Sequence, residues 1–249
     1  MSSELRAKAR EKLTGKWGKA ACMVLVYLLV FFLIGFIQGL LSDSGFLNLI
    51  ITIAVYVIEI PISFGLMMAL FKLFRNEEVL TLSFLDYGFS NFSKAWNVTL
   101  KIVLKMVVPL IFIVAAYILF GVAFSLYARA VFLSIYSSGS SGLGLATFLM
   151  FAGLVLLIVG AIWGTMKFYY YQLAYLLSID NPDMTPADAV LKSKELMTNN
   201  RGKLFCLQLS FIGWSILSVF TFGIGFLWLI PYIQFATICF YNRLAGKEE

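Results

Sequence analysis

The run AACMVLVYLLVFFLIGFIQGLLS, from Ala20 to Ser42, decides the class of fold. It has 23 residues and contains no Asp, Glu, Lys or Arg. About 20 apolar residues, coiled as a helix, cross the hydrocarbon core of a bilayer. The sequence therefore predicts a membrane-crossing helix over this run.

Three further runs extend the pattern towards the middle of the chain. Ser44–Phe71 is interrupted only by Glu59, and Met106–Ala128 carries no charge. Ala130–Met166 is also free of charge, but residues 137–144 are rich in Ser and Gly and are typical of a turn. The span in this third run is therefore expected to begin near Leu145.

The last run, Leu204–Asn242, has 39 residues, which is too long for one helix and enough for two short ones. A turn at Thr221–Gly225 would divide it. We expect an all-α polytopic membrane protein, a single membrane domain over residues 1–249, with six transmembrane helices arranged as three up-down hairpins. The predicted spans are about 20–41, 47–72, 104–128, 145–167, 204–220 and 224–242. Five spans remain the alternative, if the last run is one span plus a buried or re-entrant piece.

Composition supports the membrane class. Of the 249 residues, 61% are hydrophobic and 13% are charged, and the mean hydropathy is +0.91. Soluble domains carry roughly 25% charged residues. A soluble fold of this length could not bury so much apolar surface.

Lys and Arg set the expected orientation. Eighteen of the 19 lie at residues 6–19, 72–105, 167–203 and 243–247, on one side of the predicted spans, and only Arg129 falls on the other side. Cytoplasmic loops are the ones enriched in Lys and Arg. Both termini are therefore expected in the cytoplasm of a multi-pass protein of the bacterial cytoplasmic membrane, and the exterior loops are short. The net charge of +6 follows from this topology and does not indicate nucleic-acid binding.

Several kinds of chemistry are excluded or unsupported. The chain has no histidine, which excludes Ser-His-Asp and Cys-His catalysis. Its three cysteines, Cys22, Cys206 and Cys239, lack the spacing of a zinc site or a disulfide framework. The cytoplasmic acids, Asp180 and Asp183 among them, have no ion-binding spacing and are interpreted as solvated. We expect no enzymatic activity, no metal and no cofactor.

Two segments of the chain resemble each other at an offset of 184 residues. Glu11, Thr14, Gly18, Lys19 and Cys22 match residues 195, 198, 202, 203 and 206, and residues 91–96 are a weaker echo. The pattern predicts an internal repeat of three units, each a cytoplasmic amphipathic helix followed by a hairpin. Chance similarity between Lys-rich juxtamembrane segments is the alternative.

The first amphipathic helix is expected over residues 1–19. Leu5, Ala9, Leu13 and Trp17 recur every four residues, with Lys and Arg between them. Such a helix lies on a membrane surface with its apolar stripe in the lipid and its cations at anionic headgroups. Membrane lipids are therefore the expected partners.

The carboxy-terminal half also carries a long series of motifs. They are DNPD at residues 180–183, SKELM at 193–197, GKLF at 202–205, LSFIGW at 209–214, TFGIG at 221–225 and LWLIPY at 227–232. Together with the basic segment Arg6–Lys19, they resemble the bacterial membrane family catalogued as domain of unknown function 975. The resemblance implies a cytoplasmic-membrane protein, mostly of Gram-positive bacteria. It implies no reaction, catalytic residue or cofactor.

Glu59 and Pro61 form the first candidate binding site. Glu59 lies near the middle of the second predicted span, where a charge costs on the order of 3 kcal/mol to insert. Pro61 has no backbone N–H, so the carbonyl of Val57 lacks its helical partner. An acid beside a helix break is common at ion and substrate sites. The alternative is a neutral Glu59 that is hydrogen-bonded to a neighbouring helix as a packing clamp.

Other polar and aromatic residues are assigned to the membrane interface or to packing. Lys105, a weaker binding candidate, lies about one turn inside the third span, where its side chain can reach the interface. Trp17, Lys19, Lys167 and the run Tyr169–Tyr171 are expected at the cytoplasmic interface. Trp214, Trp228, Pro231 and Tyr232 of the last hairpin favour packing over a pocket.

Two functions remain open. The first is non-enzymatic handling or transport of an ion, a lipid or an amphiphilic peptide, with Glu59 at the site. The second is a membrane scaffold or accessory subunit with a membrane protein partner, docked through the cytoplasmic amphipathic helices. A lipid-modifying enzyme is disfavoured, because Glu59 has no acidic neighbour in its span.

Overall fold

The computed structural model describes residues 1–40, 45–136 and 143–247, and within them every regular element is an α-helix. The predicted exterior loops at 42–44 and 137–144 lie largely outside the described residues. Two compact units are present: Met1–Lys101 with Tyr170–Glu249, and Ile102–Tyr169. The prediction of a single membrane domain remains a prediction.

Five segments in the described part of the chain are long and apolar enough to cross a membrane. They are Trp17–Leu40, Asn48–Phe74, Phe92–Leu133, Gly144–Asp180 and Arg201–Phe220. The first four correspond to the first four predicted spans, so the all-α membrane class is confirmed. The last predicted span, at 224–242, is not among the five.

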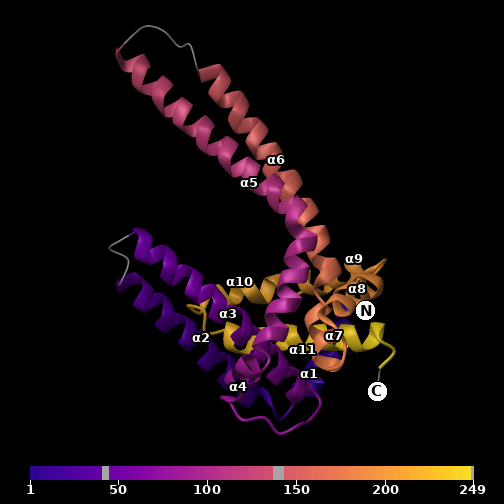
Figure 1. Cartoon of the computed structure of the whole chain (residues 1–249). Helices are drawn as coiled ribbons and strands as arrows, with labels where there is room; N and C mark the ends of the chain where they lie inside the picture. The colour runs from indigo at the N-terminus through magenta and orange to yellow at the C-terminus, as the bar shows by residue number, and fades with distance from the viewer. Residues whose placement is uncertain (41–44, 137–142, 248–249) are drawn as a thin grey trace. The chain divides into compact units, whose positions relative to one another are not determined.

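The smaller unit, Ile102–Tyr169, contains most of α5 (Phe92–Tyr136) and of α6 (Leu143–Tyr171), which Figure 1 shows side by side, while the first turns of α5 belong to the larger unit. Small residues let the two helices approach closely. A Cβ atom on Gly160 would lie 3.1 Å from the Ile113 side chain and 3.3 Å from that of Phe112. The rings of Phe112 and Trp163 meet edge to face at 5.6 Å.

The larger unit begins with two helices that a sharp turn separates. They are α1 (Ser2–Leu13) and α2 (Trp17–Leu40), and Gly15 in the turn has a φ of +78°. Lys16, just before α2, donates from Nζ to the Leu73 carbonyl oxygen at 2.8 Å and also to the Asn76 side chain. It thereby satisfies a carbonyl at the end of α3 (Gly45–Phe74), where a helix favours a cation. Burial lowers the pKa of the Lys16 amine.

The apolar stripe of α1 does not face lipid. Leu5, Ala9 and Leu13 are at most 1% exposed. They are buried because α1 packs on α11 (Phe226–Leu244) and also contacts α9 (Arg201–Leu209). The expectation of a stripe lying in the membrane surface is therefore wrong for α1, and the surface that covers the stripe belongs to the chain itself.

A short helix that was not predicted, α4 (Ser83–Ser90), packs tightly on α3. Two glycines permit the contact. A Cβ atom on Gly65 would lie 2.0 Å from the Phe84 carbonyl oxygen, and one on Gly88 would lie 2.5 Å from the Pro61 carbonyl oxygen. The backbones of α3 and α4 therefore touch directly at the level of Pro61.

The carboxy-terminal part of the chain folds as five helices. After α7 (Ala174–Asp180) come α8 (Pro186–Met197), α9, α10 (Ile212–Phe220) and α11. The turn predicted at Thr221–Gly225 is confirmed between α10 and α11. Gly225 is required there, because its Cβ atom would lie 2.6 Å from Oγ of Ser218.

The core of the larger unit centres on α11. Phe235, Ala236, Ile238, Phe240 and Tyr241 are at most 1% exposed. The ring of Phe235 also packs edge to face on that of Phe74 at 5.3 Å. Thus α11 packs largely against the chain's own helices.

The helices α1 and α8 end in the same way. Thr14 and Thr198 each follow the last residue, and each donates its hydroxyl to the carbonyl four residues earlier, at 3.0 and 2.8 Å. Each is followed by a residue in the left-handed region, Gly15 (φ +78°) and Asn199 (φ +67°). The first and last residues of α8 lie 184 positions after those of α1, and α9 begins 184 positions after α2.

Candidate functional site

Glu59 lies in a cavity of about 410 Å³ inside the larger unit. The cavity lies between α3, α7 and α11. Its polar and aromatic lining is Tyr56, Glu59, Ser63, Phe64, Tyr175 and Gln234. Each of these three helices therefore contributes a polar side chain to one space.

Some of the polar groups around the cavity are already paired. The hydroxyl of Ser63 hydrogen-bonds that of Tyr27 at 3.0 Å, and the hydroxyl of Tyr175 hydrogen-bonds that of Thr99 at 2.8 Å. The ring of Phe64 packs against that of Tyr175 at 6.0 Å. These contacts hold Tyr175 in place, so that side of the cavity is fixed before any ligand enters.

Glu59, Gln234 and Tyr56 differ from their neighbours. None of these three side chains makes a hydrogen bond or an ion pair with another residue in the described part of the chain. Glu59 is half-buried. A packing clamp would need a hydrogen-bond partner on a neighbouring helix, and the described residues supply none.

The helix break expected at Pro61 is not present, because α3 continues through Pro61 as one helix, and the carbonyl that Pro61 leaves free is satisfied from another helix. The indole N–H of Trp96, in α5, donates to the Val57 carbonyl oxygen at 3.2 Å. This is the carbonyl that the sequence predicts to lack its helical partner. Sequence reasoning missed the donor because Trp96 lies 39 residues away.

Lys105 is exposed and lies in the smaller unit, Ile102–Tyr169. Its carbonyl oxygen accepts a hydrogen bond from Nζ of Lys167 at 3.3 Å, and Lys167 Nζ also lies 5.1 Å from the centre of the Trp163 ring. The structure therefore pairs the backbone of Lys105 with the side chain of Lys167 within that unit.

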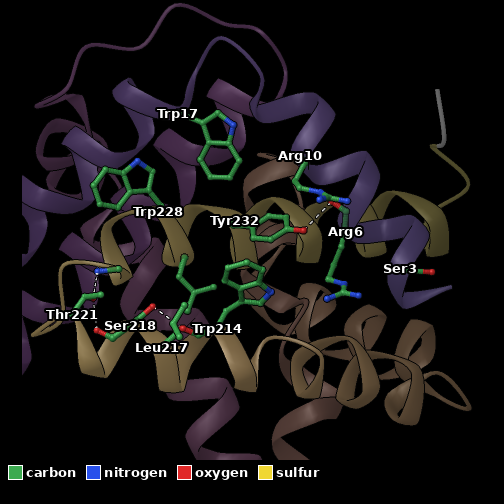
Figure 2. Close-up of a pocket in the computed structure, with 12 residues that line it drawn as sticks. Ser3, Arg6, Arg10, Trp17, Trp214, Leu217, Ser218, Thr221, Trp228 and Tyr232 are labelled. Atoms are coloured by element: carbon green, nitrogen blue, oxygen red, sulfur yellow. Dashed lines mark hydrogen bonds between the residues drawn. The ribbon is translucent and has the colours of Figure 1, made fainter.

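The remaining predicted interface residues are placed as follows. Lys19 is exposed, Tyr169 is half-buried and Tyr171 is buried. The Tyr170 ring lies 4.0 Å from the guanidinium carbon of Arg201, and its carbonyl accepts a hydrogen bond from Ser193 at 2.8 Å. Trp17 packs edge to face on Tyr232 at 5.9 Å and lines a second pocket (Figure 2).

Asp180 corrects a sequence interpretation. It was expected to be a solvated loop acid, yet its side chain is 1% exposed. It accepts hydrogen bonds from Tyr241, from Arg75 and, at 2.6 Å, from Lys247. One carboxylate thus joins the ends of α3, α7 and α11.

A family model described as protein of unknown function (DUF975) matches residues 1–248. The chain belongs to this family. The match confirms the resemblance drawn from the carboxy-terminal motifs and from the basic segment Arg6–Lys19. Neither the curated proteins nor the solved structures contain a match to this DUF975 chain.

Across the described residues, no three Asp, Glu, Cys or His side chains form a group that could hold a metal ion. The donors around the Glu59 cavity are one carboxylate, one amide and several hydroxyls. Divalent cations prefer six or more oxygen ligands, usually including several carboxylates. The donors around this DUF975 cavity are therefore fewer and less charged than those that a divalent cation prefers.

Proposed function

We propose that this DUF975 protein is a non-enzymatic, transport-type membrane protein that binds a cationic amphiphile in the Glu59 cavity. The observation that carries the proposal is the half-buried carboxylate of Glu59, which has no partner among the described residues and faces a largely apolar space. Removing a carboxylate from water without a partner is unfavourable, so the site gains free energy when a cation enters.

The rest of the lining defines the chemical class of the ligand. The aromatic rings of Tyr56, Phe64 and Tyr175 can contact a cation through their faces. Apolar side chains such as Ile60 and Met67 suit a hydrocarbon body. An amine or quaternary ammonium attached to an apolar group, as in an amphiphilic peptide, satisfies both.

An internal repeat would explain why the site lies where it does. If α1, α4 and α8 are equivalent, each packs on a helix that ends a hairpin: α1 on α11, α4 on α3 and α8 on α7. The matching ends of α1 and α8, and the buried residues Ala20, Ala95 and Leu204 at equivalent positions, support this interpretation. The cavity lies among α3, α7 and α11, where three such units would meet.

The proposal also specifies location and topology. Eighteen of 19 Lys and Arg fall on one side of the predicted spans, which supports a bacterial cytoplasmic membrane with both termini in the cytoplasm. Six spans would require α11 to cross the membrane as well.

The scaffold function has less support. It needs cytoplasmic amphipathic helices whose apolar stripes are free to dock a partner. The stripe of α1 is buried, and so are Ala189, Val190, Ser193 and Met197 on α8. Both helices already use these faces within the chain.

The experiment measures binding of radiolabelled tetraphenylphosphonium to the full-length protein in phosphatidylcholine nanodiscs, with empty nanodiscs as the blank. Glu59→Gln keeps the shape of the side chain and removes its charge. We expect at least about tenfold weaker binding, because the variant removes the attraction between a carboxylate and a cation in a partly desolvated space.

Glu78→Gln is the matched control, because Glu78 is an exposed acid outside the cavity. It is expected to bind the probe as the wild type does. Equal affinity of the wild type and Glu59→Gln would refute the proposal.

A further inference from the structure

A second pocket lies between α1, the start of α2, α10 and α11 (Figure 2). Its volume is about 500 Å³. Its cationic and aromatic lining residues are Arg6, Arg10, Trp17, Trp214, Trp228 and Tyr232. The sequence favoured packing for the last three, whereas the structure places them around an open space that shares no lining residue with the Glu59 cavity.

One end of this pocket is cationic. In the view of Figure 2, Arg6 and Arg10 lie at the end opposite Trp228 and Thr221. Arg6 Nη1 donates to the Ser210 carbonyl oxygen at 3.3 Å, but its Nε is buried and has no partner among the described residues. The guanidinium of Arg10 makes no hydrogen bond or ion pair with any described residue. The guanidinium groups therefore retain unused donors.

No acid neutralises these two cations from within the pocket, because none of its lining residues is Asp or Glu. Glu4, the acid nearest to Arg6 along α1, is paired with Arg243. The carbonyl of Arg6 is fixed by the Tyr232 hydroxyl, which donates to it at 3.2 Å. The backbone that carries the cations is thus held in place while their charge is left unbalanced.

The other end of the pocket is aromatic and apolar. Trp214, Leu217 and Trp228 are 56%, 58% and 47% exposed, and they form a surface continuous with the pocket. None of the indole N–H groups of Trp17, Trp214 and Trp228 donates to another described residue. Tryptophan suits a boundary where an apolar body meets a polar group.

We propose that this pocket binds one anionic phospholipid, with the phosphate at Arg6 and Arg10 and the acyl chains along Trp214, Leu217 and Trp228. Guanidinium groups bind phosphate oxygens through charge-assisted, often bidentate hydrogen bonds. A free phosphate would leave the apolar surface uncovered, whereas a lipid covers both ends. The site also explains why two arginines, rather than lysines, line the pocket.

The test uses native mass spectrometry of the full-length protein, in detergent, titrated with phosphatidylglycerol or phosphatidylcholine. The wild type is expected to retain one phosphatidylglycerol in preference to phosphatidylcholine. Arg10→Gln removes a cation that has no protein partner, so folding should be preserved. It is expected to weaken phosphatidylglycerol binding about tenfold, the loss typical of a charge-assisted hydrogen bond.

Lys19→Gln is the matched control, since Lys19 is an exposed cation that does not line the pocket. It should leave binding unchanged. The proposal is overturned if Arg10→Gln binds phosphatidylglycerol as the wild type does, or if Lys19→Gln loses as much affinity. It is also overturned if millimolar inorganic phosphate displaces the lipid completely, because the pocket would then be a phosphate site. Tetraphenylphosphonium binding at Glu59 should be the same in wild type and Arg10→Gln, so the two proposals can fail separately.

Discussion

The indole of Trp96 donates its N–H to the carbonyl oxygen of Val57, the carbonyl that Pro61 leaves without a helical partner. A side chain from α5 thus completes the hydrogen bonding of α3 two residues before Glu59. In a bilayer no water can take this role, so the Trp96 bond satisfies the carbonyl where α3 continues through Pro61 beside the cavity. Both Pro61 and Trp96 therefore shape the helix that carries Glu59.

Trp96→Phe should lower the stability of the protein by about 1–2 kcal/mol, because it leaves the Val57 carbonyl unsatisfied while keeping an aromatic ring. Unfolding of the purified protein in mixed micelles measures the change. In a Pro61→Ala background, residue 61 regains an N–H for the same carbonyl. The cost of Trp96→Phe should then shrink, and an unchanged cost would show that the hydrogen bond is not the cause.

Gly65→Ala should destabilise the protein by at least about 3 kcal/mol or prevent its accumulation, because the new methyl group would overlap backbone atoms of α4. Its Cβ atom would lie 2.0 Å from the Phe84 carbonyl oxygen and 2.6 Å from the Gly88 nitrogen. Gly35→Ala is the control, since a Cβ atom there meets nothing within 4 Å. Thermal unfolding that affected both variants equally would rule out the close contact between α3 and α4.

Asp180→Asn should destabilise the larger unit by about 1–3 kcal/mol, because it removes the charge of a buried carboxylate that pairs with two cations. The loss is smaller than for a fully buried ion pair, since Arg75 and Lys247 are partly exposed to water. Their side chains are 43% and 45% exposed, whereas that of Asp180 is 1% exposed. Asp183→Asn, at an exposed position three residues on, should change stability little. Urea or detergent denaturation of both variants gives the comparison. Equal stability of Asp180→Asn and the wild type would contradict the role of this carboxylate as a junction.

The ion pair between Glu4 of α1 and Arg243 of α11 should make the packing of these two helices less stable in acid. The hydrogen bond and the charge of Arg243 lower the pKa of Glu4 below its ordinary 4.5. A lowered folded-state pKa means that the stabilisation is present above pH 4.5 and is lost as the pH falls through the folded-state value. The wild type should therefore be more stable than Glu4→Gln at neutral pH, and the two should converge in acid. A difference that persists below the folded-state pKa would exclude this linkage.

The sequence predicted features whose cause is local. Charge-free runs located the first four segments that are long and apolar enough to cross a membrane, because length and apolarity are properties of the segment itself. Pro61 predicted the unsatisfied carbonyl of Val57 for the same reason. The turn at Thr221–Gly225 was visible because its two glycines are typical of tight turns.

The missed features depend on contacts between distant residues. Leu5, Ala9 and Leu13 form an apolar stripe that would suit lipid as well as α11, and periodicity alone cannot distinguish them. Trp96 and Val57 are 39 residues apart, and Arg6 and Tyr232 are 226 residues apart. Asp180 was interpreted as solvated because its three donors come from residues 75, 241 and 247.

The packing of α1 on α11 also has a consequence for how the protein is made. The partner surface for Leu5, Ala9 and Leu13 comes from residues that the ribosome adds more than 200 positions later. During most of synthesis α11 is therefore absent, and the apolar stripe of α1 lacks the surface that covers it in the folded protein. If the amino terminus is cytoplasmic, as proposed, the lysines and arginines of α1 suit it to lie on the anionic membrane surface during that interval and to leave the lipid when α11 is made.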